Sequence, residues 1–164
     1  MERPMTISVG DKIPNVAVML ATNDGPQKAE TSEILGKGKV ALFAVPGAFT
    51  PTCSAKHLPG FVAQADALKK MGVSKIVCMS VNDAFVMKAW AKDQNAFGKV
   101  DMLADGNGDF TRALGLELDA KGFGMGARSK RFSAIINNGV VKTLNVEEPG
   151  AFEVSSADYM LKQL

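Results

Sequence analysis

The chain has 164 residues, a length that suits one domain, so we expect a single domain over residues 1–164. Hydrophobic residues make up 46% and charged residues 22% of the chain, which is ordinary for a globular protein and argues against disorder. The net charge of +2 is too small to indicate a nucleic-acid partner, and two cysteines with one histidine exclude a disulfide framework or a cysteine-rich zinc module.

The N-terminal segment does not resemble a secretion signal, because residues 1–14 mix four charged residues with two prolines. The longest strongly apolar stretch, Val40–Val45, is far shorter than the roughly 20 residues of a membrane-spanning helix. We therefore expect a cytoplasmic protein with no membrane partner, whose two cysteines are free or catalytic rather than structural. An organelle presequence that has been removed is the alternative.

Strand and helix patterns alternate through the first two thirds of the chain. Apolar residues recur every three or four positions from Ser54 to Met71, which predicts a helix, and Pro59 predicts a kink in it near residues 55–59. Asn82 or Asp83 is expected to cap the next helix. In chain order we expect a strand at 17–20, a turn at 23–26, a helix at 33–35, buried strands at 40–45 and 75–81, a helix at 84–95, a strand at 100–104 and a helix at 110–114.

The last third of the chain begins with a predicted hairpin. Two strand patterns, at 131–137 and 140–145, flank Asn138-Gly139, which is the strongest short hairpin signal in a sequence. A helix is expected at 156–164. Alternating strands and helices predict a mostly parallel central sheet with right-handed crossovers, to which the hairpin adds an antiparallel edge. The sequence thus predicts an α/β fold, a thioredoxin-like sandwich with a mixed central sheet flanked by helices.

One loop has the features of a reactive site. Residues 46–53, Pro-Gly-Ala-Phe-Thr-Pro-Thr-Cys, follow a buried strand and lead into a helix, where backbone N–H groups stabilise negative charge. A free thiol is only about 3% ionised at pH 7, and making it about 90% thiolate takes about 3.4 kcal/mol. A helix N-terminus supplies about 0.3–2 kcal/mol of this. A fixed cation must supply the rest, and the cluster Arg128–Arg131 is the best source.

The same loop resembles a known family. Its pattern Pro46-x-x-x-Thr50-x-x-Cys53 is similar to the peroxiredoxin active site, and the longer stretch Val45–Phe61 resembles the type II branch, which includes the peroxiredoxin-five proteins. The resemblance continues through residues 78–85 and 131–133 to the last two residues. It implies a thiol peroxidase that reduces hydrogen peroxide and alkyl hydroperoxides through a cysteine sulfenic acid, in antioxidant defence and redox homeostasis, with no metal or cofactor.

The resemblance also implies a role for each site residue. Cys53 is the expected nucleophile, Thr50 hydrogen-bonds the thiolate and the substrate, Pro46 shields the pocket, and Arg131 holds thiolate and peroxide in line. Gly47, Thr50 and Arg131 are the expected substrate-binding residues. Fixed donors of these types suit the reaction, because negative charge builds on the leaving oxygen.

The second arginine and the single histidine leave two alternatives open. Arg128 is the alternative to Arg131 as the active-site arginine. His57 lies four residues after Cys53 on the predicted helix, and we interpret it as a hydrogen-bonding residue, with a Cys–His dyad as the alternative. Residues 105–109 have a hint of a calcium loop, but the pattern departs from it at the following positions, so a turn is predicted.

The cysteine count points to a one-cysteine mechanism. Mammalian members of the family carry a resolving cysteine near the C-terminus, whereas residues 155–164 contain none. Cys78 lies in an apolar strand, so we interpret it as a core residue, with a secondary redox role as the alternative. An external thiol is then expected to reduce the sulfenic acid, and in this branch it is glutathione with glutaredoxin, or thioredoxin.

Two further expectations concern function and assembly. The alternative function is a non-enzymatic peroxide sensor that relays oxidation to a partner protein. A thioredoxin-type disulfide reductase is disfavoured because Cys53 has no second cysteine two or three residues away. The resemblance also implies a homodimer that pairs through the Pro46–Thr50 loop and the segment around Phe85.

Overall fold

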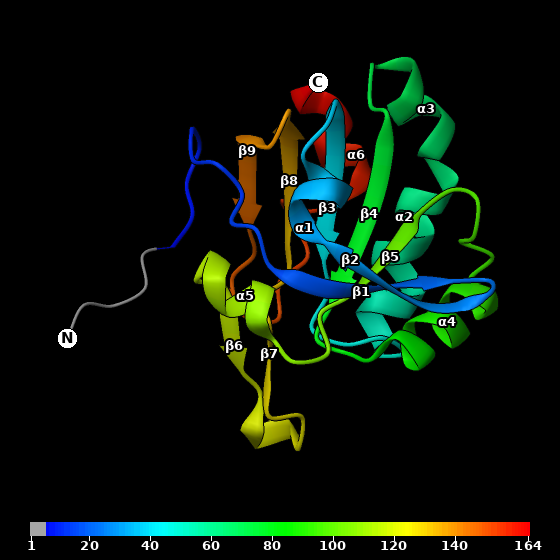
Figure 1. The fold of residues 1–164 in the computed structure, drawn as a ribbon, viewed down its shortest axis with the longest axis vertical. Helices are drawn as coiled ribbons and strands as arrows, with labels where there is room; N and C mark the ends of the chain where they lie inside the picture. Colours follow the sequence, from blue (N-terminus) through cyan, green and yellow to red (C-terminus); the bar gives the residue numbers. More distant parts are fainter. Residues whose placement is uncertain (1–5) are drawn as a thin grey trace.

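The computed structural model describes residues 6–164, so residues 1–5 of the N-terminal segment discussed above lie outside it. Seven strands form one sheet in the order β2-β1-β5-β4-β3-β8-β9 (Figure 1). The strands are β1 (Ala17–Thr22), β2 (Gly25–Glu30), β3 (Lys39–Ala44), β4 (Lys75–Ser80), β5 (Asp101–Ala104), β8 (Phe132–Asn137) and β9 (Val140–Val146). The helices are α1 (Thr31–Leu35), α2 (Leu58–Ala63), α3 (Ala65–Lys70), α4 (Ala84–Asp93), α5 (Asp109–Leu114) and α6 (Ala157–Gln163).

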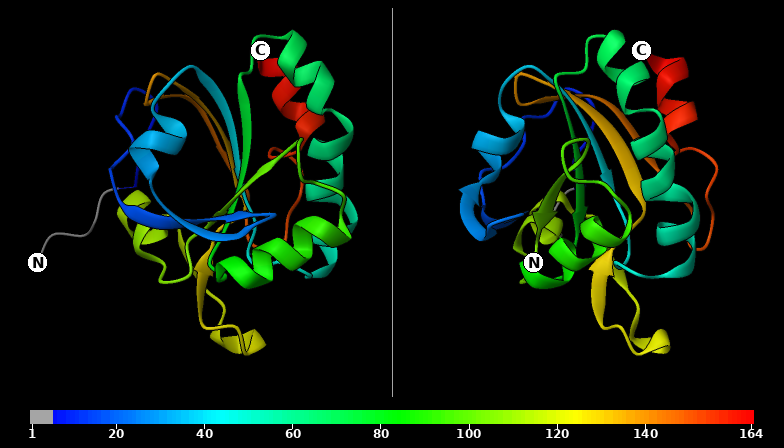
Figure 2. Two further views of the ribbon diagram at one scale, coloured as in Figure 1. Left: turned by 45° about the vertical axis from the view of Figure 1, so that its right-hand side comes forward. Right: turned by 90° about the vertical axis from the view of Figure 1, so that its right-hand side faces the viewer.

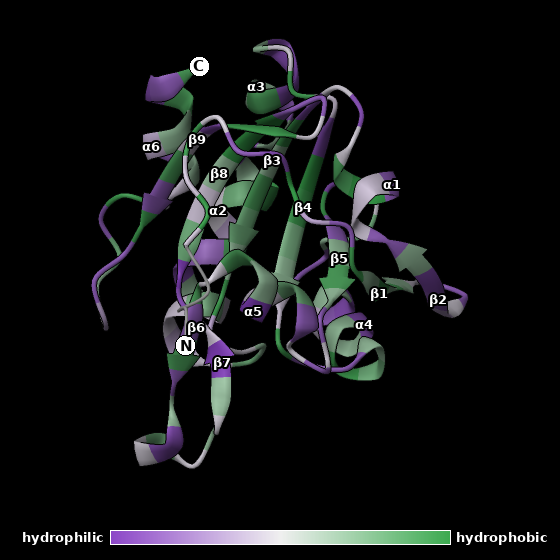
Figure 3. Ribbon diagram, turned by 60° about the vertical axis from the view of Figure 1, so that its left-hand side comes forward, coloured by the Kyte–Doolittle hydropathy of each residue, from purple (hydrophilic) through white to green (hydrophobic). Residues whose placement is uncertain are grey.

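Alternating side chains of the buried strands divide the core into two layers. In β3, Ala41 and Phe43 belong to the layer covered by α2, α3, α4 and α6, whereas Val40 and Leu42 belong to the layer covered by α1 and α5 (Figure 2). Hydrophobic residues run along β3 and β4, which helices cover on both faces (Figure 3). The predicted thioredoxin-like sandwich is confirmed.

The sheet is less parallel than predicted. Among the strands of residues 6–164, only β3, β4 and β5 run parallel, and β1 pairs antiparallel with β5, which was not predicted. Strand β8 pairs antiparallel with β3, which confirms the antiparallel edge predicted for the hairpin. The hairpin at Asn138-Gly139 is confirmed, with both residues at positive φ. Strand β2 was not predicted, because its sequence Gly-Pro-Gln-Lys-Ala-Glu has no β-branched or aromatic residue. It forms at the sheet edge, where Pro26 is tolerated.

The predicted helix 54–71 is divided into three pieces. A π-helical turn, Cys53–His57, precedes α2, and a break at Gln64 separates α2 from α3. Pro59 explains the first irregularity, because it has no N–H to donate to the carbonyl four residues earlier. The chain instead adopts the wider turn, in which Leu58 N–H donates to the Cys53 carbonyl. The kink is therefore a π-helical turn, and the break at Gln64 had no signal in the sequence.

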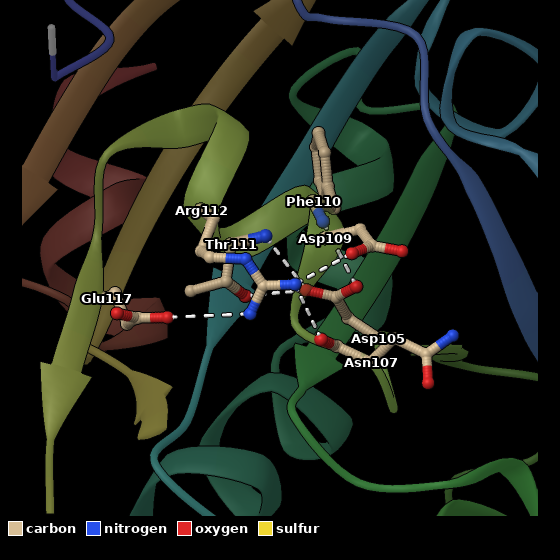
Figure 4. A network of polar contacts seen from close by, with 7 residues as sticks. All are labelled: Asp105, Asn107, Asp109, Phe110, Thr111, Arg112 and Glu117. Carbon is tan, nitrogen blue, oxygen red and sulfur yellow. Dashed lines mark hydrogen bonds and ion pairs between the residues drawn. The ribbon is translucent and has the colours of Figure 1, made fainter. Parts of the chain in front are cut away.

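Loop carboxylates fix the starts of two helices. Asp83 caps α4 by accepting a hydrogen bond from Val86 N–H, so Asn82 is not the cap. Asp105 accepts hydrogen bonds from Phe110 N–H and from the N–H and hydroxyl of Thr111 at the start of α5 (Figure 4). The predicted turn at 105–109 is confirmed, because Gly108 N–H donates to the Asp105 carbonyl at 2.9 Å.

The segment after α5 forms an arm that projects from the body (Figure 1). Strands β6 (Glu117–Asp119) and β7 (Ala127–Ser129) pair with each other, and a 3₁₀ turn, η2 (Lys121–Phe123), lies at the tip. Neither short strand was predicted. Among residues 6–164, no helix combines the length and the hydropathy that spanning a bilayer requires.

Candidate active site

Sheet register explains how residues far apart in sequence meet at one site. The loop with the reactive-site pattern leaves the carboxyl end of β3, and β8 enters the sheet beside it. Ala44, the last residue of β3, pairs with Phe132, the first residue of β8. Arg131 therefore lies at the end of the sheet where the reactive loop begins. The carboxyl ends of the parallel strands lie at this end of the sheet, and ligand sites of open α/β sheets occur there.

The Cys53 thiol is fully buried and held by two side chains. Its Sγ lies 2.8 Å from Thr50 Oγ1 and 3.0 Å from Arg131 Nη2. Thr50 Oγ1 is also 2.6 Å from the Gly47 carbonyl oxygen. The hydroxyl has one proton, so it donates to Gly47 when the sulfur is protonated and to Sγ when the sulfur is a thiolate. The geometry therefore accommodates both protonation states without moving a heavy atom.

His57 connects Arg131 to the rest of the core. Arg131 Nη1 lies 2.8 Å from His57 Nδ1, and His57 Nε2 lies 2.9 Å from the Ser155 carbonyl oxygen. A guanidinium only donates and a carbonyl only accepts, so the imidazole is neutral, with its proton on Nε2. Burial, followed by the charge of Arg131, lowers the pKa of His57 to about 3. His57 is thus a hydrogen-bonding residue and not a base near neutral pH, which argues against the Cys–His dyad.

This depressed pKa predicts a specific loss of stability in acid. Below the ordinary value of 6.5 and down to about 3, the unfolded chain binds a proton on His57 that the folded chain does not. The free energy of unfolding therefore decreases as the pH falls through this window, by up to about 1.4 kcal/mol per pH unit from this group. Denaturant unfolding of wild type and His57→Gln between about pH 8 and pH 5 measures this decrease in the free energy of unfolding. A difference between the two proteins that does not vary with pH would contradict the neutral histidine.

Other expected residues lie around the loop rather than at the sulfur. Arg128 Nε donates to the Met125 carbonyl at 2.9 Å and Nη1 lies 3.5 Å from the Pro46 carbonyl oxygen, so Arg128 joins the arm to the loop. A Cβ on Gly47 would meet Arg128 Nη1 and Thr50 Cγ2 at 3.1 Å and Met125 Cε at 3.2 Å. A larger residue at Gly47 would therefore require these three side chains to shift by a few tenths of an ångström. Of the two arginines, only Arg131 hydrogen-bonds Sγ.

Two supporting side chains were missed in the sequence. Asn82 Oδ1 accepts hydrogen bonds from Ala48 N–H at 3.0 Å and from the Ser80 hydroxyl at 2.6 Å, which ties the end of β4 to the reactive loop. Trp90 Nε1 donates to Ser54 Oγ at 3.0 Å, which ties α4 to the π-helical turn. A polar residue between a buried strand and a capped helix was the only signal for Asn82.

Cys78 lies in the middle of the sheet and away from solvent. It pairs with Phe43 in β3 and Met102 in β5, and none of its surface is exposed. Burial raises the pKa of the Cys78 thiol well above its ordinary value, so the thiolate that redox chemistry requires is disfavoured. Both cysteines are free in this structure.

Comparison with known proteins agrees with this geometry. The Redoxin family model matches residues 8–161. A chloroplastic peroxiredoxin-2E of Arabidopsis thaliana is 53% identical over 163 residues, which cover 97% of this chain and 70% of the relative. Reduced Prx3 of Vibrio vulnificus, in complex with hydrogen peroxide, superposes with a TM-score of 0.92 at 53% identity and covers 96% of this chain and 99% of that one.

A more distant structure has the same fold. The Plasmodium falciparum antioxidant protein, a 1-Cys peroxiredoxin, superposes with a TM-score of 0.89 at 31% identity, over 96% of this chain and 100% of that one. The family match spans nearly the whole chain, and the site presents a buried cysteine between a threonine and an arginine. The chain therefore belongs to the Redoxin family, as a peroxiredoxin of the type II kind, and is a thiol-dependent peroxidase.

Proposed function

We propose that Cys53 is the nucleophile of this peroxidase and that Thr50 and Arg131 stabilise its transition state. The Cys53 thiolate attacks the terminal oxygen of a hydroperoxide, the O–O bond breaks, and that oxygen with its hydrogen stays on sulfur as a sulfenic acid. The departing alkoxide or hydroxide takes up a proton from solvent. The contact of Sγ with both Thr50 Oγ1 and Arg131 Nη2 is the observation that carries this proposal.

A cavity beside Arg131 supports alkyl hydroperoxides as well as hydrogen peroxide as substrates. Its volume is about 280 Å³, and both Pro46 and Arg131 line it. The lining combines apolar residues such as Leu118, Val146 and Pro149 with charged ones, which are Arg131, Lys130, Glu147 and Glu148. We propose that the alkyl group occupies this cavity while the peroxide oxygens lie between Arg131 and Thr50.

The buried position of Cys78 favours regeneration by an external thiol. Cys78 lies in a central strand and its thiolate is disfavoured, so it is poorly suited to attack a sulfenic acid on Cys53. The similarity to a 1-Cys peroxiredoxin supports the same route. We propose that glutathione with glutaredoxin, or thioredoxin, reduces the sulfenic acid, and that the protein acts in a reducing compartment such as the cytoplasm.

One experiment tests the nucleophile and the regeneration route together. The reduced protein is treated with one equivalent of hydrogen peroxide and its peptides are analysed by mass spectrometry. We expect one added oxygen atom on the Cys53 peptide, none on the Cys78 peptide, and loss of that oxygen with either reductant. A Cys53–Cys78 disulfide would contradict regeneration by an external thiol. Oxidation confined to Cys78 would contradict the assignment of Cys53 as the nucleophile.

We propose a homodimer that pairs through the end of the molecule that carries the site, next to the carboxyl end of β3. Two phenylalanines are exposed where the reactive loop contacts the start of α4, Phe49 by 52% and Phe85 by 70%, and Phe123 at the tip of the arm is exposed by 86%. Phe49 lies in the reactive loop at a φ of 65°, a strained backbone conformation for an aromatic residue. Large aromatic side chains that are exposed to this extent are typical of a protein interface.

Phe85→Glu is expected to convert this dimer to a monomer, because a carboxylate would be desolvated in an apolar contact. Sedimentation equilibrium of wild type and variant measures the change. Met71→Glu is the matched control, since Met71 is 45% exposed at the end of α3, which lies at the opposite end of the sheet (Figure 1). A monomeric wild-type protein, or equal association of all three proteins, would contradict the proposed interface.

A further inference from the structure

The segment that connects β9 to α6 packs around Arg131. Glu147 N–H donates to the Arg131 carbonyl at 2.9 Å, so the segment starts at the backbone of this arginine. The Phe152 ring lies 5.8 Å from the guanidinium carbon and 5.0 Å, edge to face, from the His57 ring. The Ser155 carbonyl accepts the proton of His57 Nε2. Figure 2 shows the segment running beside the helix that begins at the reactive loop.

Glu147 holds this segment in its closed shape. Its Oε2 accepts hydrogen bonds from three successive backbone N–H groups, those of Glu153 at 2.8 Å and of Val154 and Ser155 at 2.9 Å. The Ser155 hydroxyl is a fourth donor, at 2.6 Å. Burial raises the pKa of Glu147, but the four hydrogen bonds outweigh it and lower the pKa below its ordinary value. The residue is thus an anion at neutral pH, although it is only 6% exposed.

We propose that Glu147 is a positioning residue for the peroxidase reaction, which acts on Cys53 through Ser155, His57 and Arg131. The proposal rests on the proposed roles of Cys53 and Arg131. Each step of this route is a hydrogen bond. Ser155 N–H donates to the Glu147 carboxylate and His57 Nε2 donates to the Ser155 carbonyl, while Arg131 donates through Nη1 to His57 Nδ1 and through Nη2 to Sγ.

The planar guanidinium makes this route effective. With Nη1 held by His57, the fixed fork of Arg131 directs Nη2 to the sulfur. If the Ser155 carbonyl moves away, one of the two contacts that keep the imidazole proton on Nε2 is lost, and only the Arg131 donor still favours this tautomer. A proton on Nδ1 would then face the donor Nη1, and Arg131 would turn away from Cys53. Lys130 and Glu148 are the other charged groups lining the cavity next to this segment, and both are exposed.

The test compares Glu147→Gln with Glu153→Gln, an exposed glutamate of the same segment that undergoes the same change of charge, keeps its backbone N–H and does not line the cavity. The rate constant for reaction with hydrogen peroxide is measured in single turnover from about pH 5 to pH 9. We expect Glu147→Gln to lower it about tenfold, the effect of losing one charge-assisted hydrogen bond, and to move the rising part of the pH profile to higher pH. Glu153→Gln is expected to match wild type in both respects.

A second readout does not depend on activity. His57 is the only histidine, so its ring nitrogens are unambiguous in a ¹⁵N NMR spectrum. Wild type is expected to show a proton on Nε2 and no titration between about pH 5 and pH 8. Glu147→Gln is expected to show exchange between tautomers. A folded variant with an unchanged rate profile, or with a slower rate and an unchanged His57 signal, would overturn the proposal.

Ser155→Ala decides the question if Glu147→Gln does not fold. This variant removes one of the four donors to Glu147 and therefore loosens the segment, although the backbone carbonyl that His57 needs is kept. The rate profile and the His57 signal are expected to change in the same direction as in Glu147→Gln but by less, with about a threefold loss of rate. An unchanged profile and His57 signal in folded Ser155→Ala would equally overturn the proposal. Failure of the proposed function is separate, because it appears as peroxidase activity in a Cys53 variant and leaves the NMR comparison valid.

Discussion

Replacing Cys53 with serine is expected to lower peroxide reduction by at least about 10⁴-fold, to the rate without enzyme. A serine hydroxyl is not ionised near neutral pH, and the nearby groups that hold Sγ, Thr50 and Arg131, stabilise an anion that serine does not provide. Peroxide consumption is measured with glutathione and glutaredoxin, and separately with thioredoxin, in excess. The oxygen of serine fits the site, so the variant is expected to fold like wild type.

Cys78→Ser is the matched control for this prediction. It removes the only other cysteine in the sequence and is expected to keep the turnover of wild type, because Cys78 is buried in the sheet away from solvent. Its stability is expected to fall by about 1–3 kcal/mol, because a hydroxyl then lies in an apolar core. Substantial activity in Cys53→Ser would refute the assignment of Cys53 as the nucleophile. Loss of turnover in a folded Cys78→Ser would assign a resolving role to Cys78.

Arg131→Met is expected to slow the reaction with hydrogen peroxide by about 10²–10³-fold, the usual effect of removing one fixed donor that stabilises charge in a transition state. The variant keeps most of the side-chain volume and loses both hydrogen bonds, to Sγ and to His57 Nδ1. Single-turnover kinetics isolate the peroxide step from regeneration.

Arg128→Met provides the comparison between the two arginines. Arg128 joins the arm to the reactive loop through two carbonyls and does not hydrogen-bond the sulfur. Its replacement is therefore expected to slow the peroxide step less than about tenfold. If Arg128→Met proves to be the slower of the two variants, the assignment of Arg131 as the active-site arginine is wrong.

Most of the fold could be predicted because its central strands and helices have strong periodic patterns. The strands that were missed are β2, β6 and β7, all at edges or in the arm, where side chains pack on one side or not at all. The edge position of β2 follows from its pairing with β1, not from its own residues. The sequence also overestimated the parallel portion of the sheet. The hairpin of β1 and β2 was not expected, and its strand β1 pairs antiparallel with β5.

The residues that support the site were harder to predict than those that react. Cys53 and Thr50 belong to one short loop motif, so their proximity is local. His57 is near them in sequence, but its role depends on Ser155 and Arg131, which approach from other elements. Glu147 had no signal at all, because a glutamate in a polar loop is usually solvated. Only the folded segment shows that its carboxylate closes a loop around the arginine.

The sequence by itself determined the reactive loop, the nucleophile candidate and the need for a cation, because each depends on residue type and on short-range geometry. It also determined that few groups were available, with two cysteines and one histidine. The tertiary structure decided which arginine reaches Sγ, which proton tautomer His57 adopts and why Cys78 is buried. The physical reason is that strand register and loop packing set these contacts across long sequence separations, where no local pattern records them.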